Sequence, residues 1–227
     1  MTTAFDAYSR DYEAVVQQSI AFAGLDYDVF VQAKVRLLAE LFACHFGAAR
    51  PALLDVGCGV GVMHGLLEAL TGSLAGTDRS SEALARARRE HPHVEYRPQS
   101  DGGLPWEDAA FDVTLAVCVF HHVPPCERPA LAAEMRRVTR PGGLTIVIEH
   151  NPLNPLTRLA VARCPFDHDA ILLGAGESRT MLARAGLRRV HSQHFLVFPI
   201  ANRLTSSIER RLRGVPLGAQ FVAFGEA

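Results

Sequence analysis

The sequence predicts an α/β fold built around a mainly parallel sheet, and three observations predict it. From residue 51 onward, short apolar runs typical of buried strands alternate with segments that have helical spacing. The run from Phe111 to Val119 is almost continuously apolar, which is typical of a parallel strand covered on both faces. Two last strand-like runs, at 190–198 and 219–224, are close enough along the chain to form an antiparallel pair.

The individual elements follow from the spacing of apolar residues. Buried strands are expected at 52–56, 73–78, 94–97, 111–119 and 144–148. Helices are expected at 5–22, at 29–46, after Gly61, after the capping residue Ser80, around 131–138 and at 177–185. Because helices alternate with the strands, parallel strands joined by right-handed crossovers are expected.

The composition excludes several classes of function. Hydrophobic residues make up 48% of the 227 residues and charged residues 21%, which excludes a disordered chain. A net charge of −1 gives no general attraction to nucleic acid. The first residues contain acids and no apolar core of a secretion signal, and no run reaches the roughly 18 apolar residues of a membrane helix. We therefore expect a cytoplasmic monomer or homodimer that has no nucleic-acid or membrane partner.

The potential metal ligands do not form a recognised motif. The five cysteines contain no C-x-x-C pair, so neither a disulfide framework nor structural zinc is expected. The triplet Asp167-His168-Asp169 suggests a metal site, but alternate residues of an extended chain point apart and the sequence offers no further ligand cluster nearby. A polar segment over the active site or a helix cap is the preferred interpretation, and no metal is expected.

The strongest signal is the segment Leu53–Gly61, which reads LLDVGCGVG. Its alternate glycines let the backbone turn sharply and approach a ligand between a strand and a helix. Asp78 ends the next strand, 17 residues after Gly61, where an acid can accept both hydroxyl groups of a ribose. A nicotinamide dinucleotide fingerprint would need glycine in place of Val62, so the pattern argues against that cofactor.

These residues resemble motif I of the class I S-adenosylmethionine-dependent methyltransferases. The similarity covers roughly residues 30–150 and is closest to the small-molecule branch that contains the ubiquinone and menaquinone enzymes, the "methyltransferase 11" group. Further matching segments are GTDRS at 76–80, SDG at 100–102, LPW at 104–106, FDV at 111–113, FHHV at 120–123 and RPGGL at 140–144. The resemblance implies a Rossmann-like three-layer sandwich with a seven-stranded mixed sheet that ends in an antiparallel C-terminal strand pair.

The resemblance also implies how the cofactor is held. Gly57, Cys58 and Gly59 would cradle its methionine part, and Asp55 would orient that loop. Asp78 would hold the ribose, with Arg79 beside the adenine. The adenine would be recognised by Asp101 and Gly102, and the methionine amino group by the backbone of Val117 and Cys118. Asp55 and Asp112 have a structural alternative, because acids at strand ends often cap loops.

Lys34 is the one lysine in the chain, against 22 arginines, and it falls inside the apolar arc of the helix at 29–46. A lysine among apolar residues lowers stability unless its ammonium group reaches an anion or water. One interpretation is a side chain that extends to solvent at a domain edge. The other is an ion pair with the cofactor's carboxylate, which a basic residue on this helix provides in similar enzymes.

Three histidines follow the central strands and are candidate general bases. His122 occupies the position at which similar enzymes place a histidine facing the transferred methyl group, in some cases paired with a tyrosine of the N-terminal helix, here Tyr8 or Tyr12. His121 and His150 end neighbouring strands, at the edge where ligands of open α/β sheets bind. A structural hydrogen bond is the alternative for each of them.

We therefore expect methyl transfer from S-adenosyl-L-methionine to a small, partly apolar metabolite, with S-adenosyl-L-homocysteine as the other product. Residues 1–50 would form an N-terminal helical cap, and 51–227 the cofactor-binding domain, in which 151–176 covers the active site. Oxygen, nitrogen and carbon acceptors stay open, including acceptors of natural-product biosynthesis. Two alternatives remain: a cofactor-binding protein with another reaction, such as a cyclisation, and a nicotinamide-dependent oxidoreductase.

Overall fold

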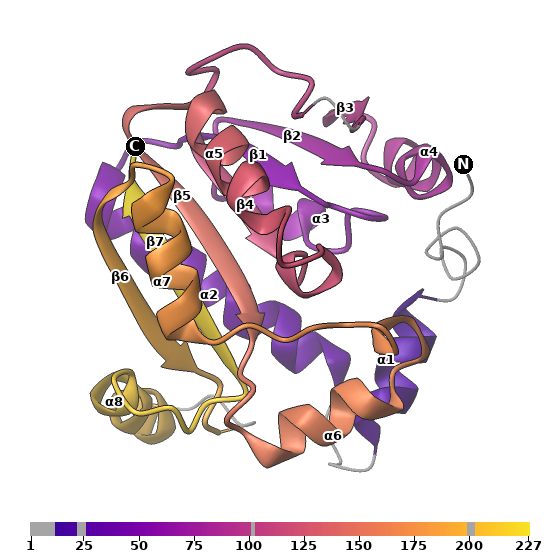
Figure 1. Ribbon diagram of the computed structural model, residues 1–227, viewed down its shortest axis with the longest axis vertical. Helices are drawn as coiled ribbons and strands as arrows, with labels where there is room; N and C mark the ends of the chain where they lie inside the picture. Colours follow the sequence, from indigo (N-terminus) through magenta and orange to yellow (C-terminus); the bar gives the residue numbers. More distant parts are fainter. Residues whose placement is uncertain (1–11, 22–25, 101–102, 199–202) are drawn as a thin grey trace.

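The computed structural model describes residues 12–21, 26–100, 103–198 and 203–227, and a seven-stranded sheet crosses it (Figure 1). The strand order is β3-β2-β1-β4-β5-β7-β6. The strands are β1 (Ala52–Val56), β2 (Ser73–Asp78), β3 (Glu95–Pro98), β4 (Phe111–Val117), β5 (Thr139–His150), β6 (Arg188–Phe195) and β7 (Gln220–Glu226). The pairs among β1 to β5 are parallel, whereas β7 runs antiparallel to both β5 and β6. The predicted mixed sheet with an antiparallel C-terminal pair is confirmed.

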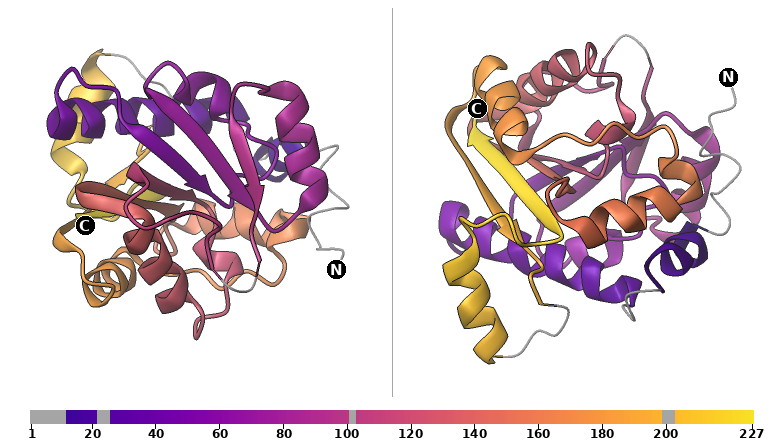
Figure 2. Two further views of the ribbon diagram at one scale, coloured as in Figure 1. Left: turned by 90° about the horizontal axis from the view of Figure 1, so that it is seen from above. Right: turned by 60° about the horizontal axis from the view of Figure 1, so that its bottom comes forward.

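Helices cover both faces of this sheet (Figures 1 and 2). They are α1 (Tyr12–Ile20), α2 (Tyr27–Phe46), α3 (His64–Leu67), α4 (Ser81–Glu90), α5 (Arg128–Val138), α6 (Pro155–Arg163), α7 (Ala175–Arg184) and α8 (Arg203–Leu212), with short 3₁₀ turns η3 (Phe120–His122) and η4 (Pro165–Asp167). None of the helices in the described ranges is long and apolar enough to cross a membrane.

The alternation of side chains along each strand divides the core into two layers. Leu53 and Leu54 are neighbours in β1, yet they belong to different hydrophobic clusters because successive side chains point to opposite faces. One cluster joins the sheet to α2, α3 and α4, and the other joins it to α5 and α7. Helix α2 contributes four buried residues to the first cluster, namely Val31, Leu37, Leu38 and Phe42. It therefore packs with α3 and α4 against the same face of the sheet.

Three helical segments differ from the sequence prediction. The helix expected after Gly61 shortens to the single turn of α3, in which Gly65 disfavours helix propagation. The residues 151–155 predict a turn-rich break and no helix was predicted after them, yet α6 begins at Pro155. Asn154 caps this helix by accepting from the amides of Leu156 and Thr157, and Pro155 occupies its first turn. Helix α8 was not predicted at all.

The carboxyl ends of the parallel strands meet at one edge of the sheet, and the segment after β5 returns across that edge. Helices α1 and α6 contact each other there, beyond the end of β5 (Figures 1 and 2). The turn η4 directly follows α6. This arrangement places the segment 151–176 beside the edge where the functional residues were expected.

The packing of α2 gives a direct test of this core. Leu38 is fully buried, whereas Leu153 is 69% exposed. We expect Leu38→Ala to lower the free energy of unfolding by about 2–5 kcal/mol, because it removes buried methyl groups and leaves a cavity. The control Leu153→Ala should change it by less than about 0.5 kcal/mol. Urea denaturation followed by circular dichroism measures both, and equal losses would contradict the assigned core.

Candidate active site

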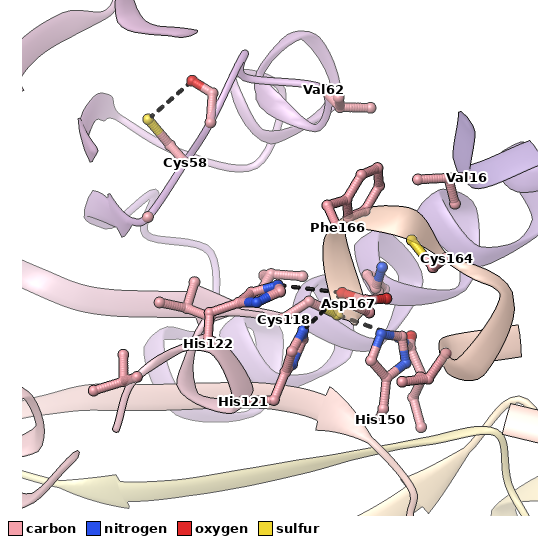
Figure 3. A pocket seen from close by; sticks show the side chains of 18 of the residues that line it. Val16, Cys58, Val62, Cys118, His121, His122, His150, Cys164, Phe166 and Asp167 are labelled. Atoms are coloured by element: carbon pink, nitrogen blue, oxygen red, sulfur yellow. Dashed lines mark hydrogen bonds and ion pairs between the residues drawn. The ribbon is translucent and has the colours of Figure 1, made fainter. Parts of the chain in front are cut away.

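A cavity of about 1470 Å³ opens at the carboxyl edge of the sheet. Its walls come from α1, α2, the loops after β1, β2 and β4, the end of β5, α6 and η4. Figure 3 shows its polar end, where three histidines and an aspartate face one another. The sequence motifs that follow separate strands therefore meet in one cavity.

The glycine loop after β1 forms one wall. Gly57 has a φ of 71°, and the amides of Gly57 and Cys58 both donate to the carbonyl of Thr77, at 2.7 and 3.1 Å. A Cβ on Gly57 would lie 2.6 Å from a methyl carbon of Val119, so no larger residue fits. Gly59 has a φ of 54°, but a Cβ there would meet no atom within 4 Å. Gly57 is thus fixed by packing, whereas Gly59 faces open space.

Asp78 connects this loop to the end of β2. One carboxylate oxygen accepts from the amide of Gly59 and the other from the amide of Ser80, each at 2.8 Å. Burial raises the pKa of the Asp78 carboxyl above its usual value, although these amides partly offset the effect. Ser80 in turn caps α4 by accepting from Ala83, as predicted. Arg79, between Asp78 and Ser80 in the sequence, also lines the cavity.

Asp55 belongs to a buried polar chain beneath the loop. Its carboxylate is 3.1 Å from Nε2 of His64, and Nδ1 of the same ring is 2.6 Å from the Tyr96 hydroxyl. Burial raises the pKa of the Tyr96 phenol, so the hydroxyl stays neutral. A Cβ on Gly61 would lie 2.9 Å from the His64 ring, which explains the third glycine. The partner His64 was missed, because nothing in its local sequence distinguishes it from a helix residue.

Lys34 reaches the cavity from α2. It is 6% exposed and lines the cavity, and within the described part of the chain its ammonium group has neither a hydrogen-bond partner nor an ion-pair partner. The sequence left open whether this side chain reaches solvent or an anion. Its burial against the cavity leaves a positive charge that an anionic ligand can satisfy.

The end of β4 also lines the cavity. Cys118 has a left-handed φ of 56°, and its amide donates to the carbonyl of Ile148 at 2.8 Å. The thiol accepts from the side-chain amide of Gln220 at 3.5 Å. Burial raises the pKa of the Cys118 thiol, so it is not a thiolate. Since the Cys118 amide is already used, backbone carbonyls of Val117 and Cys118 are the groups that this strand end offers a ligand.

The polar end of the cavity consists of a histidine–carboxylate cluster (Figure 3). Nδ1 of His121 is 2.6 Å from a carboxylate oxygen of Glu149, and its Nε2 is 3.4 Å from Oδ1 of Asp167. Nε2 of His122 is 3.3 Å from the same Asp167 oxygen. The His150 ring centre lies 5.1 Å from that of His121. Hence η3, the end of β5 and η4 each contribute to one small cluster.

The charges in this cluster depend on one another. Burial opposes protonation of His121, but the charge of Glu149 and the hydrogen bonds to both carboxylates outweigh it and raise the imidazole pKa well above its usual value. Burial also opposes ionisation of Glu149 and Asp167. The charge and hydrogen bond of His121 outweigh it at Glu149, the hydrogen bonds of His121 and His122 outweigh it at Asp167, and the pKa of each carboxyl is lowered. Burial, followed by the charge of His121, lowers the pKa of His150 to about 4. Of the neighbouring rings of His121 and His150, that of His150 is therefore uncharged at neutral pH.

The structure brings most of the predicted site residues together. The following all line the cavity: Lys34, Asp55, Gly57, Cys58, Gly59, Asp78, Arg79, Val117, Cys118, His121, His122 and His150. Asp112 lies elsewhere, where it accepts from the amide of Ala52 and pairs with Arg140, which supports its structural alternative. Tyr8, Asp101 and Gly102 lie outside the described residues, and Tyr12 begins α1.

Besides His64, two residues of the histidine–carboxylate cluster were missed or misjudged in the sequence prediction. The expectation that Asp167 has no further ligands nearby is wrong, because it lies with His121 and His150 in a group whose potential ligand atoms are all within 4.8 Å of one another. Glu149 was not singled out, although it is fully buried and holds His121. A charged residue inside an otherwise apolar strand run was the available signal for Glu149.

Comparison with known proteins follows this geometry. A family model described as a methyltransferase domain matches residues 54–147. Methyltransferase GfsG of Streptomyces halstedii is 31% identical over 163 residues, which are 62% of this chain and 58% of the relative. A demethylmenaquinone methyltransferase of Chlorobaculum parvum is 30% identical over 114 residues, 49% of this chain and 46% of the relative. The chain thus spans about half the length of the relatives that it matches.

The fold itself extends over nearly the whole chain. A SAM-dependent methyltransferase from Thermotoga maritima superimposes with a TM-score of 0.67 and 17% sequence identity, and the match covers 98% of this chain and 97% of that one. This likeness concerns the fold, whereas the match to the family model covers residues 54–147, which include the glycine loop. Residues 54–147 thus match a methyltransferase domain, and the chain shares its fold with a solved methyltransferase structure.

Proposed function

We propose that this protein transfers a methyl group from S-adenosyl-L-methionine to a small, partly apolar acceptor. The observation that carries the proposal is that Asp78 and Lys34 line the same cavity as the glycine loop. A carboxylate suited to ribose hydroxyl groups and an ammonium group suited to a carboxylate match the two polar parts of this cofactor. The match of residues 54–147 to a methyltransferase domain supports the same cofactor.

Each loop around the cavity then has a role toward the cofactor. The open space over Gly59 admits the methionine part close to the backbone, and the amide of Gly59 is released when ribose hydroxyl groups replace it at Asp78. Carbonyls of Val117 and Cys118 accept from the amino group, and Arg79 lies beside the adenine. Asp101 and Gly102 complete adenine recognition in this proposal. The Asp55–His64 contact holds the loop from beneath.

The acceptor occupies the part of the cavity between α1, α6 and η4. Apolar side chains line this part, namely Val16, Ile20, Val161, Phe166 and Leu196. The polar cluster of His121, His122 and Asp167 lies at its inner end. A molecule with an apolar body and one polar reacting group fits this distribution, whether the reacting atom is oxygen, nitrogen or carbon. The segment 151–176 acts as the cover over it.

The bound cofactor supplies a methyl group that its sulfonium already activates. The protein contributes in-line positioning, and it needs a base only where the acceptor carries a proton. We assign that base to His122, whose side chain is 21% exposed and whose Nε2 lies 3.3 Å from Asp167. The carboxylate orients the ring and stabilises the imidazolium that forms. His121 is less suited, since a carboxylate lies at each of its ring nitrogens.

A direct test combines binding with product analysis. The protein is titrated with S-adenosylhomocysteine in a calorimeter and then incubated with methyl-deuterated S-adenosylmethionine and a panel of phenols, amines and enolisable ketones. The proposal predicts binding of about one equivalent and a product heavier by one labelled methyl group. Binding without any methylated product would favour a cyclisation or another reaction. Binding of a nicotinamide dinucleotide in place of S-adenosylhomocysteine would overturn the proposal.

The role of Asp78 predicts a specific loss of affinity. Asp78→Ala removes a charged acceptor of two hydroxyl donors, which costs about 1.5–3 kcal/mol and weakens cofactor binding roughly tenfold or more. Asp78→Asn retains an acceptor for the amide of Ser80 and should lose a smaller part of the affinity. The control Asp108→Ala changes an exposed acid of the same charge and should leave the Kd unaltered. Unchanged calorimetric affinity in both Asp78 variants would place the ribose elsewhere.

Lys34 predicts opposite effects on affinity and stability. In Lys34→Met the apolar arc of α2 is completed and a buried charge is removed, so thermal stability should hold or rise. Cofactor affinity should fall roughly tenfold, as expected when a charge-assisted hydrogen bond is lost. Arg36→Met is the control, because Arg36 is exposed on the same helix. If Lys34→Met and the control bind the cofactor equally well, Lys34 does not hold its carboxylate.

The assignment of His122 predicts an effect on turnover. For an acceptor that must lose a proton, His122→Ala and His122→Asn should each lower kcat by roughly 10² while the Kd for the cofactor changes little. His168→Ala is the matched control, since His168 is 87% exposed and follows Asp167 directly. Near-normal kcat in both His122 variants would rule out this residue as the base.

A further inference from the structure

Three potential metal ligands meet at the polar end of the cavity. They come from separate elements: His121 from η3, His150 from the end of β5, and Asp167 from η4. Their potential ligand atoms all lie within 4.8 Å of one another, and Nε2 of His121 is 3.4 Å from Oδ1 of Asp167. Two ligands at about 2.1 Å from a tetrahedral ion lie about 3.4 Å apart, so this pair already has the required spacing. Figure 3 shows the three side chains pointing toward one another.

Glu149 holds His121 in the form that binds a metal. Its carboxylate lies 2.6 Å from Nδ1 of His121 and also accepts from the amide of Phe120 at 2.7 Å. Nδ1 thereby faces Glu149, and Nε2 points to the side of Asp167 and His150. Metal-ligating histidines are almost always held by a carboxylate or carbonyl in this way. The cluster therefore contains both a ligand set and the outer contact that orients it.

We propose that His121, His150 and Asp167 bind one divalent transition-metal ion, for which zinc is the best match. Two imidazole nitrogens and one carboxylate oxygen suit Zn²⁺, and three protein ligands leave a fourth position open, as in catalytic zinc sites. The open position faces the cavity that all three residues line. His122 is not part of this ligand set, although it contacts Asp167.

The charges around the cluster favour a bound cation. Two carboxylates, Glu149 and Asp167, flank the buried ring of His121. A divalent cation between these side chains would balance the charge of the two carboxylates. The nearby charge of Lys34 opposes a cation until an anion pairs with Lys34. A bound cofactor carboxylate would supply that anion, and the metal should then bind more tightly.

The bound ion would also link the segment 151–176, which contains Asp167, to the ends of the central strands. Asp167 belongs to the segment that follows α6, whereas His121 and His150 end central strands, so one ion would join the cover to the sheet. An acceptor oxygen or nitrogen at the open position would lose its proton more readily. This consequence rests on the proposed methyl transfer, but the binding of the metal does not.

Metal binding is tested directly on the full chain without an affinity tag. Protein treated with a chelator and then dialysed is titrated with Zn²⁺ in a calorimeter and with Co²⁺ under visible spectroscopy. We expect about one equivalent to bind and the intense d–d bands of a four- or five-coordinate Co²⁺ ion. A thiolate-to-metal charge-transfer band should be absent, because the cavity cysteines Cys58, Cys118 and Cys164 are not in the ligand set.

Matched variants separate this site from adventitious binding. His150→Gln and Asp167→Asn should each weaken Zn²⁺ binding more than tenfold, and Glu149→Gln should weaken it 10- to 100-fold through the loss of the outer contact. His168→Gln and Asp169→Asn are controls, because these residues adjoin Asp167 but are 87% and 100% exposed. They should bind as the unaltered protein does. Circular dichroism confirms that each variant is folded before it is titrated.

Three results would overturn the proposal. They are no binding by the unaltered protein, equal binding by the His150 and Asp167 variants and their controls, or a Co²⁺ spectrum with thiolate ligation. S-adenosylhomocysteine is titrated into the same metal-free samples. Binding of this molecule without any metal binding would reject the metal site and leave the proposed function standing, whereas the reverse result would reject the proposed function alone.

Discussion

The buried carboxylate of Glu149 is the constraint that organises the polar end of the cavity. A carboxylate at the end of a central strand, with no exposure to solvent, is tolerated only if it is fully hydrogen-bonded and paired. The amide of Phe120 and the ring of His121 meet this demand, and both belong to the turn that follows β4. Because Glu149 on β5 needs these partners, it fixes the position of η3, the turn that follows the neighbouring strand β4.

The effect of this constraint extends to the cover of the cavity. His121 contacts Asp167 through its second ring nitrogen, and its backbone carbonyl accepts from the amide of Ile171 at 2.9 Å. Arg128 also donates to the Ile171 carbonyl, and it pairs with Glu177 on α7. The segment between α6 and α7 is thus attached to the central strands by polar contacts.

Local patterns were sufficient to predict the sheet and the glycine loop. Strands covered on both faces must be apolar, and the turn after β1 requires glycine because Val119 leaves no space for a Cβ at Gly57. The contacts that join Asp167 to His121 and His64 to Tyr96 could not be predicted, since they depend on how distant segments pack. Helix α6 was missed for a different reason. The pair Asn154-Pro155 favours both a turn and a helix start, and only the contacts beyond it select the helix.

The proposed function requires a single orientation of the cofactor in the cavity. A crystal structure of the complex with S-adenosylhomocysteine tests this orientation most directly. The account predicts ribose hydroxyl groups at the carboxylate of Asp78, the ligand carboxylate at the ammonium group of Lys34, and the sulfur atom directed toward His122. A ligand bound in the reverse direction, or outside the cavity that these residues line, would contradict it.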